Sequence, residues 1–150
     1  MNDKNFMLYR ASAGSGKTYT LVREFLTLCL SSDNVTYNNI LAVTFTNKAA
    51  NEMKAKILNH LKGIMTDDPD FSNMKRELSE ATQLEENKLK ERAAKLYNRI
   101  IHNYSDLNVS TIDSFIQQVS RTFARELNLP NQYKLMLDKR EFLDEFIQQI

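Results

Sequence analysis

The chain has 150 residues, of which 42% are hydrophobic and 26% charged, and its formal net charge is +1. This length suits one domain with a buried core, and the composition is that of an ordinary globular protein. No apolar run approaches the roughly 18 residues of a membrane span, and the amino terminus lacks a signal-peptide apolar region. With its single cysteine, Cys29, these features lead us to expect a cytoplasmic protein without a membrane partner.

Positive charge is concentrated in the first part of the chain. Residues 1–65 carry 8 Lys and Arg against 4 Asp and Glu, whereas the remainder carries a small excess of acid. A basic excess of this size suits a polyanionic ligand without establishing one.

The first predicted elements are a strand over residues 6–11 and a helix over residues 17–30, whose apolar residues recur with a helical period. A glycine-containing segment joins them. It reads Ala11-Ser12-Ala13-Gly14-Ser15-Gly16-Lys17-Thr18. A strand, a glycine-containing loop and Gly-Lys-Thr at a helix start are typical of a phosphate-binding P-loop.

The chemistry of this segment suits the phosphate groups of a nucleotide. Backbone N–H groups of the loop and of the helix amino end bind phosphate oxygens, and glycines allow the close approach. Lys17 is predicted to contact the β- and γ-phosphates, and Thr18 to bind Mg²⁺. Since the general pattern has glycine where this chain has Ala11, the alternative is an ordinary turn before a helix.

The second strand and helix continue an alternating pattern. Residues 40–45 form a short apolar run, which predicts a strand covered on both faces, and residues 47–62 predict a helix. This helix has one apolar face, formed by Ala50, Met53, Ile57 and Leu61. The order β-α-β-α predicts a doubly wound parallel sheet with the P-loop at its carboxyl edge.

The pattern changes after an acidic turn at residues 66–70. Residues 72–104 predict one long helix or two shorter ones, packed on one side only. The expected buried face consists of Leu89, Ala93, Leu96, Ile100 and Tyr104. We interpret the lone His60 and His102 as surface or helix-face residues rather than metal ligands, and Cys29 as a buried thiol.

A third strand is predicted over residues 109–112 and a helix over residues 113–127. The inward face of this helix is expected to comprise Phe115, Ile116, Val119, Phe123 and Leu127. A short extended piece over 133–137 and a helix over 139–150 follow. The last helix ends on an apolar stripe, so we expect a fragment of a longer protein or self-association.

Two further segments carry polar side chains at the carboxyl end of a strand. In Thr44-Phe45-Thr46-Asn47-Lys48, the hydroxyls, amide and lysine suit phosphate contacts and Phe45 suits stacking on a base. The alternative is that Thr46 or Asn47 caps the helix and Phe45 lies in the core. In the second segment, Ser110 to Phe115, the favoured interpretation is a helix cap formed by Asp113.

Taken together and in this order, the segments resemble the first motor domain of superfamily 1 helicases of the UvrD/Rep type. The RecB/AddA branch of helicase–nuclease proteins is the most similar, and alanine at the first P-loop position is that branch's form. The sequence TFTNKAANEM, from Thr44, is similar to motif Ia, which contacts single-stranded DNA. The sequence TIDSF, from Thr111, resembles a segment written TIHSF in many relatives, with Asp113 in place of the usual histidine.

The resemblance implies an α/β, P-loop NTPase (RecA-like) fold, with a partial parallel sheet, flanking helices and a helical excursion. Residues 1–66 and 106–130 would form the P-loop half of the motor domain, 67–105 the helical excursion, and 131–150 the start of a truncated helical insertion. Lys17 and Thr18 are the implied catalytic residues, with ATP and Mg²⁺ as cofactors. The implied DNA contacts are Thr44, Phe45, Thr46, Asn47, Lys48, Thr111, Asp113 and Ser114.

The implied partners are single-stranded or duplex-end DNA, the remainder of the helicase chain and a nuclease subunit. A P-loop ATPase also needs an acidic pair after an apolar strand, and only Leu135 to Asp138 imitates one, with Lys139 after it. We therefore expect this chain alone to bind nucleotide weakly and to hydrolyse essentially none. The alternatives are a small stand-alone P-loop phosphotransferase and a non-catalytic nucleic-acid-binding module.

Overall fold

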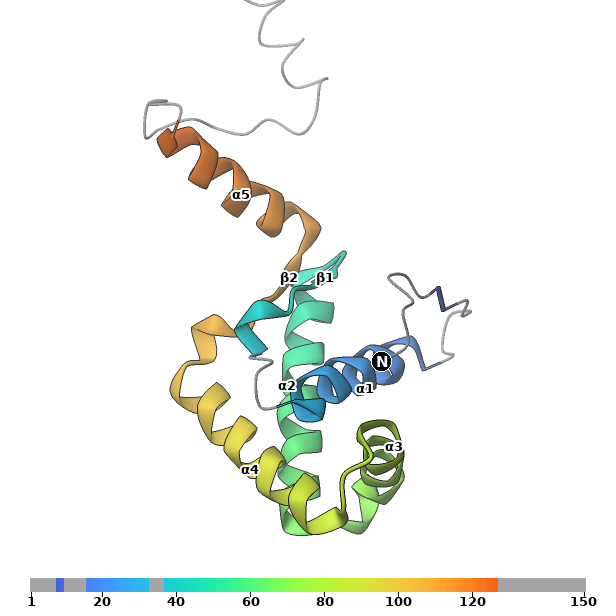
Figure 1. Ribbon diagram of the computed structural model, residues 1–150. Coiled ribbons are helices and arrows are strands. Elements are labelled where there is room, and N and C mark those ends of the chain that lie inside the picture. The colour runs from blue at the N-terminus through green and yellow to red at the C-terminus, as the bar shows by residue number, and fades with distance from the viewer. Residues whose placement is uncertain (1–7, 10–15, 33–36, 127–150) are drawn as a thin grey trace, which may run out of the picture. The chain divides into compact units, whose positions relative to one another are not determined.

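The computed structural model describes residues 8–9, 16–32 and 37–126 of the chain (Figure 1). These residues are mostly helical. Their elements are α1 (Lys17–Ser31), the short 3-10 helix η1 (Tyr37–Asn39), β1 (Ala42–Thr44), α2 (Asn47–Thr66), η2 (Pro69–Phe71), α3 (Ser72–Thr82), α4 (Glu86–His102), η3 (Tyr104–Asp106), β2 (Val109–Thr111) and α5 (Ile112–Glu126). Strands β1 and β2 pair in a two-stranded parallel sheet.

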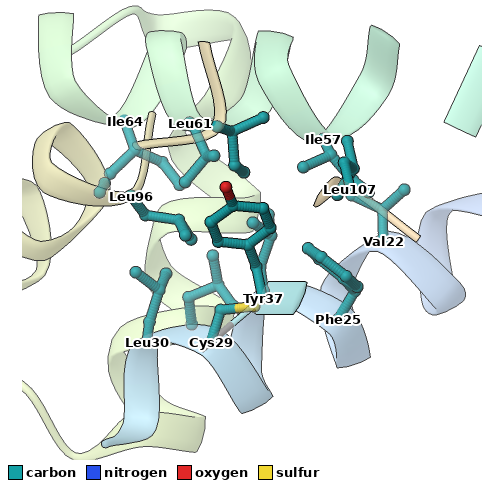
Figure 2. Close-up of a cluster of buried hydrophobic side chains, with 14 of the residues drawn as sticks. Val22, Phe25, Cys29, Leu30, Tyr37, Ile57, Leu61, Ile64, Leu96 and Leu107 are labelled. Atoms are coloured by element: carbon teal, nitrogen blue, oxygen red, sulfur yellow. The ribbon is translucent and has the colours of Figure 1, made fainter. Parts of the chain in front are cut away.

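The chain divides into two compact units, Met1–Ser110 and Thr111–Ile150. In the first unit, α2 packs against α1, α3 and α4, and the core lies among these helices. Figure 2 shows side chains from α1 and α2 converging on the ring of Tyr37. The Tyr37 hydroxyl donates to the carbonyl oxygens of Arg99 and Asn103 at the end of α4, at 3.3 and 3.2 Å. The core is therefore closed by an aromatic ring whose one polar atom is satisfied.

Local chemistry explains where the helices of the first unit end. Helix α2 stops at Asp67, which adopts a left-handed conformation with φ 55°, and Pro69 follows two residues later. Gln83 has φ 57° and ends α3, so the predicted helical region over 72–104 is two helices rather than one. Gly63 in α2 lies against Phe71, whose ring atom Cδ2 would be 2.2 Å from an added Cβ. A glycine at this position therefore lets η2 fold back closely onto α2.

Several expectations are confirmed. The helices predicted from residues 17, 47 and 113 begin within one residue of α1, α2 and α5, and α2 continues one turn beyond its predicted end. Four of the five residues expected to be buried on α4 are buried, and Cys29 is a buried thiol whose pKa is raised to about 12 by that burial. Tyr104 is the exception: it is 45% exposed and Lys54 lies over its ring, because it has left the helix for η3.

Other expectations are corrected. Strand β1 is three residues long and is not covered on both faces, because Leu41 and Val43 are 45% and 44% exposed. On α5 the predicted inward stripe is exposed at Ile116, Val119 and Phe123. The helical spacing of apolar residues correctly predicts that α5 is a helix. Burial of its apolar face also requires another surface to pack against, which the spacing does not specify.

Part of the predicted first strand is also corrected. Leu8 and Tyr9, its two described residues, lie in no regular element and are exposed. The rest of the first strand lies outside the described residues, as do the predicted extended piece over 133–137 and the predicted helix over 139–150. No helix in the described ranges is both long and apolar enough to cross a membrane.

Candidate functional site

The amino end of α1 starts from a residue with an unusual backbone conformation. Gly16 has φ 79° and ψ 15°, and its carbonyl oxygen accepts from the N–H of Thr20 at 3.0 Å, the first bond of the helix. An added Cβ would meet nothing within 4 Å. Glycine is therefore required here by the left-handed backbone and not by a close neighbour.

This helix end has several features that are typical of anion-binding helix starts. Within the described residues no side chain caps α1, and its first turn contains no acidic residue. The N–H groups of Lys17, Thr18 and Tyr19 precede the first intrahelical bond, so they have no acceptor within the helix. Lys17 is exposed and Thr18 half-buried. N–H groups that have no acceptor within their helix, the positive end of the helix dipole and a lysine are features that bind phosphate.

The predicted nucleotide-binding segment is thus seen in part. Gly16, Lys17 and Thr18 lie at the start of α1, where the sequence predicts a helix to begin, whereas Ala11, Ser12, Ala13, Gly14 and Ser15 lie outside the described residues. The donor set that is present fits the phosphate groups of a nucleotide with its Mg²⁺, because Thr18 supplies a hydroxyl oxygen, a ligand type that Mg²⁺ accepts.

Behind this turn lies a polar cluster that sequence reasoning missed. The hydroxyl of Tyr19 donates to Glu77 at 3.2 Å, and the guanidinium of Arg23 contacts Glu24 at 2.7 Å and Glu77 at 3.5 Å. The hydrogen bond to Glu24 raises the pKa of Arg23, and burial, followed by the charge of Glu77, raises the pKa of Tyr19. No local pattern reveals Glu77, because it lies on α3, far along the chain from Tyr19.

His60 lies beside the same turn. Its ring is edge-on to Tyr19 at 6.0 Å and to Phe71 at 5.0 Å, and its buried Nδ1 has no hydrogen-bond partner among the residues that the structure describes. Burial, then the charge of Lys56, lowers the pKa of His60. The spacing of His60 from Ile57 and Ile64 could have placed it on the buried side of α2.

The second candidate segment starts α2. The Thr46 hydroxyl accepts from the N–H of Ala49 at 3.1 Å, so Thr46 is the helix cap, as the alternative interpretation allowed. Thr44 Oγ1 donates to the Thr46 carbonyl oxygen at 3.1 Å. Phe45 is 88% exposed, which shows that its assignment to the core would be wrong. Lys48 is also exposed, with its amine 4.0 Å from Glu52.

The third segment starts α5, and here the structure corrects the predicted cap. Thr111, not Asp113, caps the helix: its Oγ1 accepts from the N–H of Ser114 at 3.1 Å and donates to the Ser114 hydroxyl at 2.8 Å. Asp113 is exposed in the first turn, where its charge favours the helix dipole.

The amino end of α1 and the amino end of α2 lie apart from each other. Tyr19 contacts His60, which is 13 residues beyond the first residue of α2 and therefore about 20 Å along the helix from it. The structure thus sets the amino end of α1 beside the carboxyl-terminal half of α2, away from Thr46, whereas the sequence predicted one shared sheet edge.

Among the described side chains, no group of three His, Cys, Asp or Glu is arranged to hold a metal.

Comparison with known proteins assigns the chain to a family. Residues 2–150 match the UvrD/REP helicase N-terminal domain. An ATP-dependent helicase/nuclease protein from Natranaerobius thermophilus is 28% identical over 98% of the chain and 10% of the relative. The proteins of the same name from Bacillus cereus strain AH820 and Bacillus thuringiensis strain Al Hakam are each 31% identical, over 95% of the chain and 10% of each relative.

The chain thus spans about a tenth of the length of the curated relatives it matches. No solved structure gives a significant match. Because the family match extends over almost every residue, the chain belongs to the UvrD/Rep helicase N-terminal domain family.

Proposed function

We propose that this chain supplies the N-terminal, ATP-binding part of an ATP-dependent DNA helicase of the helicase–nuclease type, acting in the cytoplasm. The family match and the relatives named as ATP-dependent helicase/nuclease proteins support this proposal. Residues 1–66 and 106–130 would belong to the motor domain, 67–105 to a helical excursion and 131–150 to the start of an insertion. The partners would be the rest of the helicase, a nuclease subunit, and single-stranded or duplex-end DNA.

The observation that carries the proposal is the start of α1 at Gly16. Its left-handed backbone turns the chain into a helix whose first N–H groups have no side-chain cap within the described residues. Lys17 would neutralise charge on the β- and γ-phosphates, Thr18 would bind Mg²⁺, and residues 11–15 would complete the anion-binding loop. When bound, ATP supplies the phosphoryl transfer whose free energy drives movement along DNA.

The start of α2 supports a DNA contact of a different kind. Phe45 offers an exposed ring for a base, and Lys48 an exposed charge for a phosphate. The hydroxyls of Thr44 and Thr46 hold the turn that presents them. Asn47 would add a polar contact. We propose Thr111, Asp113 and Ser114 as further DNA contacts, with Thr111 also shaping the start of α5.

A nucleotide titration tests the proposal. Lys17→Ala should weaken binding of a fluorescent ATP analogue with Mg²⁺ by about tenfold to a hundredfold, because charge-assisted hydrogen bonds contribute about 1.5–3 kcal/mol. Lys88→Ala, which removes an exposed lysine near the start of α4, is the matched control and should bind as the wild type does. Equal affinity of Lys17→Ala and wild type would remove the basis for the ATP site.

The two alternatives give different outcomes in the intact protein. A stand-alone phosphotransferase would transfer phosphate to a small acceptor without DNA. A non-catalytic nucleic-acid-binding module would bind single-stranded DNA in a salt-dependent way with no effect of nucleotide. The helicase proposal requires ATP hydrolysis that DNA stimulates and that Lys17→Ala abolishes.

A further inference from the structure

Glu77 on α3 contacts the first two turns of the helix that carries Lys17 and Thr18, although it lies 58 residues beyond Tyr19 in the sequence. Its Oε1 accepts from the Tyr19 hydroxyl at 3.2 Å, and its Oε2 accepts from Nη1 of Arg23 at 3.5 Å. The two carboxylate oxygens therefore bind consecutive turns of α1. All three side chains are partly buried, which limits competition from water.

Tyr19 is itself part of the proposed phosphate site. It is the third residue of α1, so its backbone N–H has no acceptor within the helix. A side chain held in one place restrains the backbone that carries it. The bond to Glu77 therefore restrains the direction in which the N–H groups of Lys17, Thr18 and Tyr19 point.

The ring of Tyr19 is restrained from a second side. His60 on α2 meets it edge-on at 6.0 Å with an interplanar angle of 78°, and Phe71 meets His60 at 5.0 Å and 90°. Phe71 reaches this position because Gly63 has no side chain to obstruct it. Contacts from α2 and α3 thus converge on Tyr19 in the first turn of α1, and Phe71 of η2 supports the contact from α2 by packing on His60.

We propose that Glu77 is a positioning residue for nucleotide binding, which acts by fixing Tyr19 and with it the phosphate-binding turn of α1. This inference rests on the proposed ATP site at that turn. It adds a role for α3: this helix sets the affinity of a site to which it contributes no ligand.

The test is a titration of the intact protein with a fluorescent ATP analogue and Mg²⁺. Glu77→Ala and Tyr19→Phe should each weaken binding by about threefold to tenfold, the effect of losing one hydrogen bond. The double variant should be no weaker than the weaker single variant, because both changes remove the same bond. Glu77→Gln keeps an acceptor for the Tyr19 hydroxyl and should recover part of the affinity. Glu80→Ala, an exposed glutamate on the same helix, is the control and should leave affinity unchanged.

Thermal unfolding of each variant separates positioning from stability. If Glu77 only stabilises the fold, Glu77→Ala will lower the melting temperature while the folded protein binds nucleotide as the wild type does, and the inference is overturned. If Lys17→Ala loses affinity while the Glu77 and Tyr19 variants keep it, the proposed ATP site stands and the role of Glu77 is rejected. If Lys17→Ala keeps full affinity, the ATP site is rejected and the role of Glu77 with it.

Discussion

The amino ends of α1 and α2 begin in opposite ways. Helix α1 starts from a left-handed glycine and, within the described residues, has no side-chain cap, so its first N–H groups have no acceptor within the helix. Helix α2 starts from Thr46, whose hydroxyl already accepts an N–H of the first turn. The capped end has less to offer an anion from its backbone, but it holds Phe45 and Lys48 outward. The comparison teaches that the proposed nucleotide site would use backbone donors together with the side chains of Lys17 and Thr18, whereas the proposed DNA site would use exposed side chains alone.

The largest expected effect in this comparison is on DNA. Phe45→Ala should weaken binding of single-stranded DNA by about fivefold to a hundredfold, because stacking a base on an aromatic ring contributes about 1–3 kcal/mol. A fluorescence anisotropy titration with a labelled oligonucleotide at fixed salt measures it. Leu28→Ala, at a 52% exposed apolar residue of α1, is the control, and Phe45→Tyr should retain binding. Unchanged affinity of Phe45→Ala would show that the exposed ring does not stack on DNA.

The next effect is at the start of α1. Gly16→Ala should lower the free energy of unfolding by about 1–2 kcal/mol, because a residue with a Cβ is strained at φ 79°. The open space around Gly16 means that only this strain, and no clash, is added. Gly16→Asn should lose less, since asparagine tolerates the left-handed region better. Urea unfolding measures the free energy of unfolding of the wild type and of both variants. Equal losses of stability in Gly16→Ala and Gly16→Asn would contradict the conformational explanation.

A smaller effect is expected at the start of α2. Thr46→Ala removes the cap and should cost about 1 kcal/mol of stability. Thr46→Ser keeps a hydroxyl that can accept from the N–H of Ala49 and should restore most of it. The urea midpoint reports the difference. If Thr46→Ser and Thr46→Ala are equally destabilised, the threonine methyl group rather than its hydroxyl supports this turn.

The smallest effect is a pH dependence that arises beside the amino end of α1. The pKa of His60 is lowered by its burial and then by Lys56, so between this lowered value and about 6.5 the unfolded chain binds more protons than the folded one. Stability should therefore rise with pH through this window and level off above it. His60→Phe should fit between Tyr19 and Phe71 and lose this slope, whereas replacement of the exposed His102 by Gln should keep it. Urea midpoints at pH 5.5 and 7.5 measure it, and a slope retained in His60→Phe would assign it to other groups.

Local physics made much of this protein predictable from its sequence. Apolar side chains at helical spacing identified α1, α2 and α4, and a glycine before Lys-Thr identified the helix start that suits a phosphate. These features depend on residues within one or two turns of each other, so the sequence determines them by itself. The same reasoning assigned the cap of α5 to Asp113, whereas Thr111 forms it, because both residue types accept N–H bonds and only the backbone position decides between them.

The rest was decided by the tertiary structure. The contact of Glu77 with Tyr19, the edge-on contacts of His60 with two aromatic rings and the exposure of Phe45 each depend on segments far apart in the chain. An apolar residue next to a strand has the same sequence signature whether another element covers it or not. Burial and long-range hydrogen bonds depend on how helices pack. The sequence by itself therefore determined helix α1, which begins the proposed site, whereas only packing determined which residues hold α1 in place.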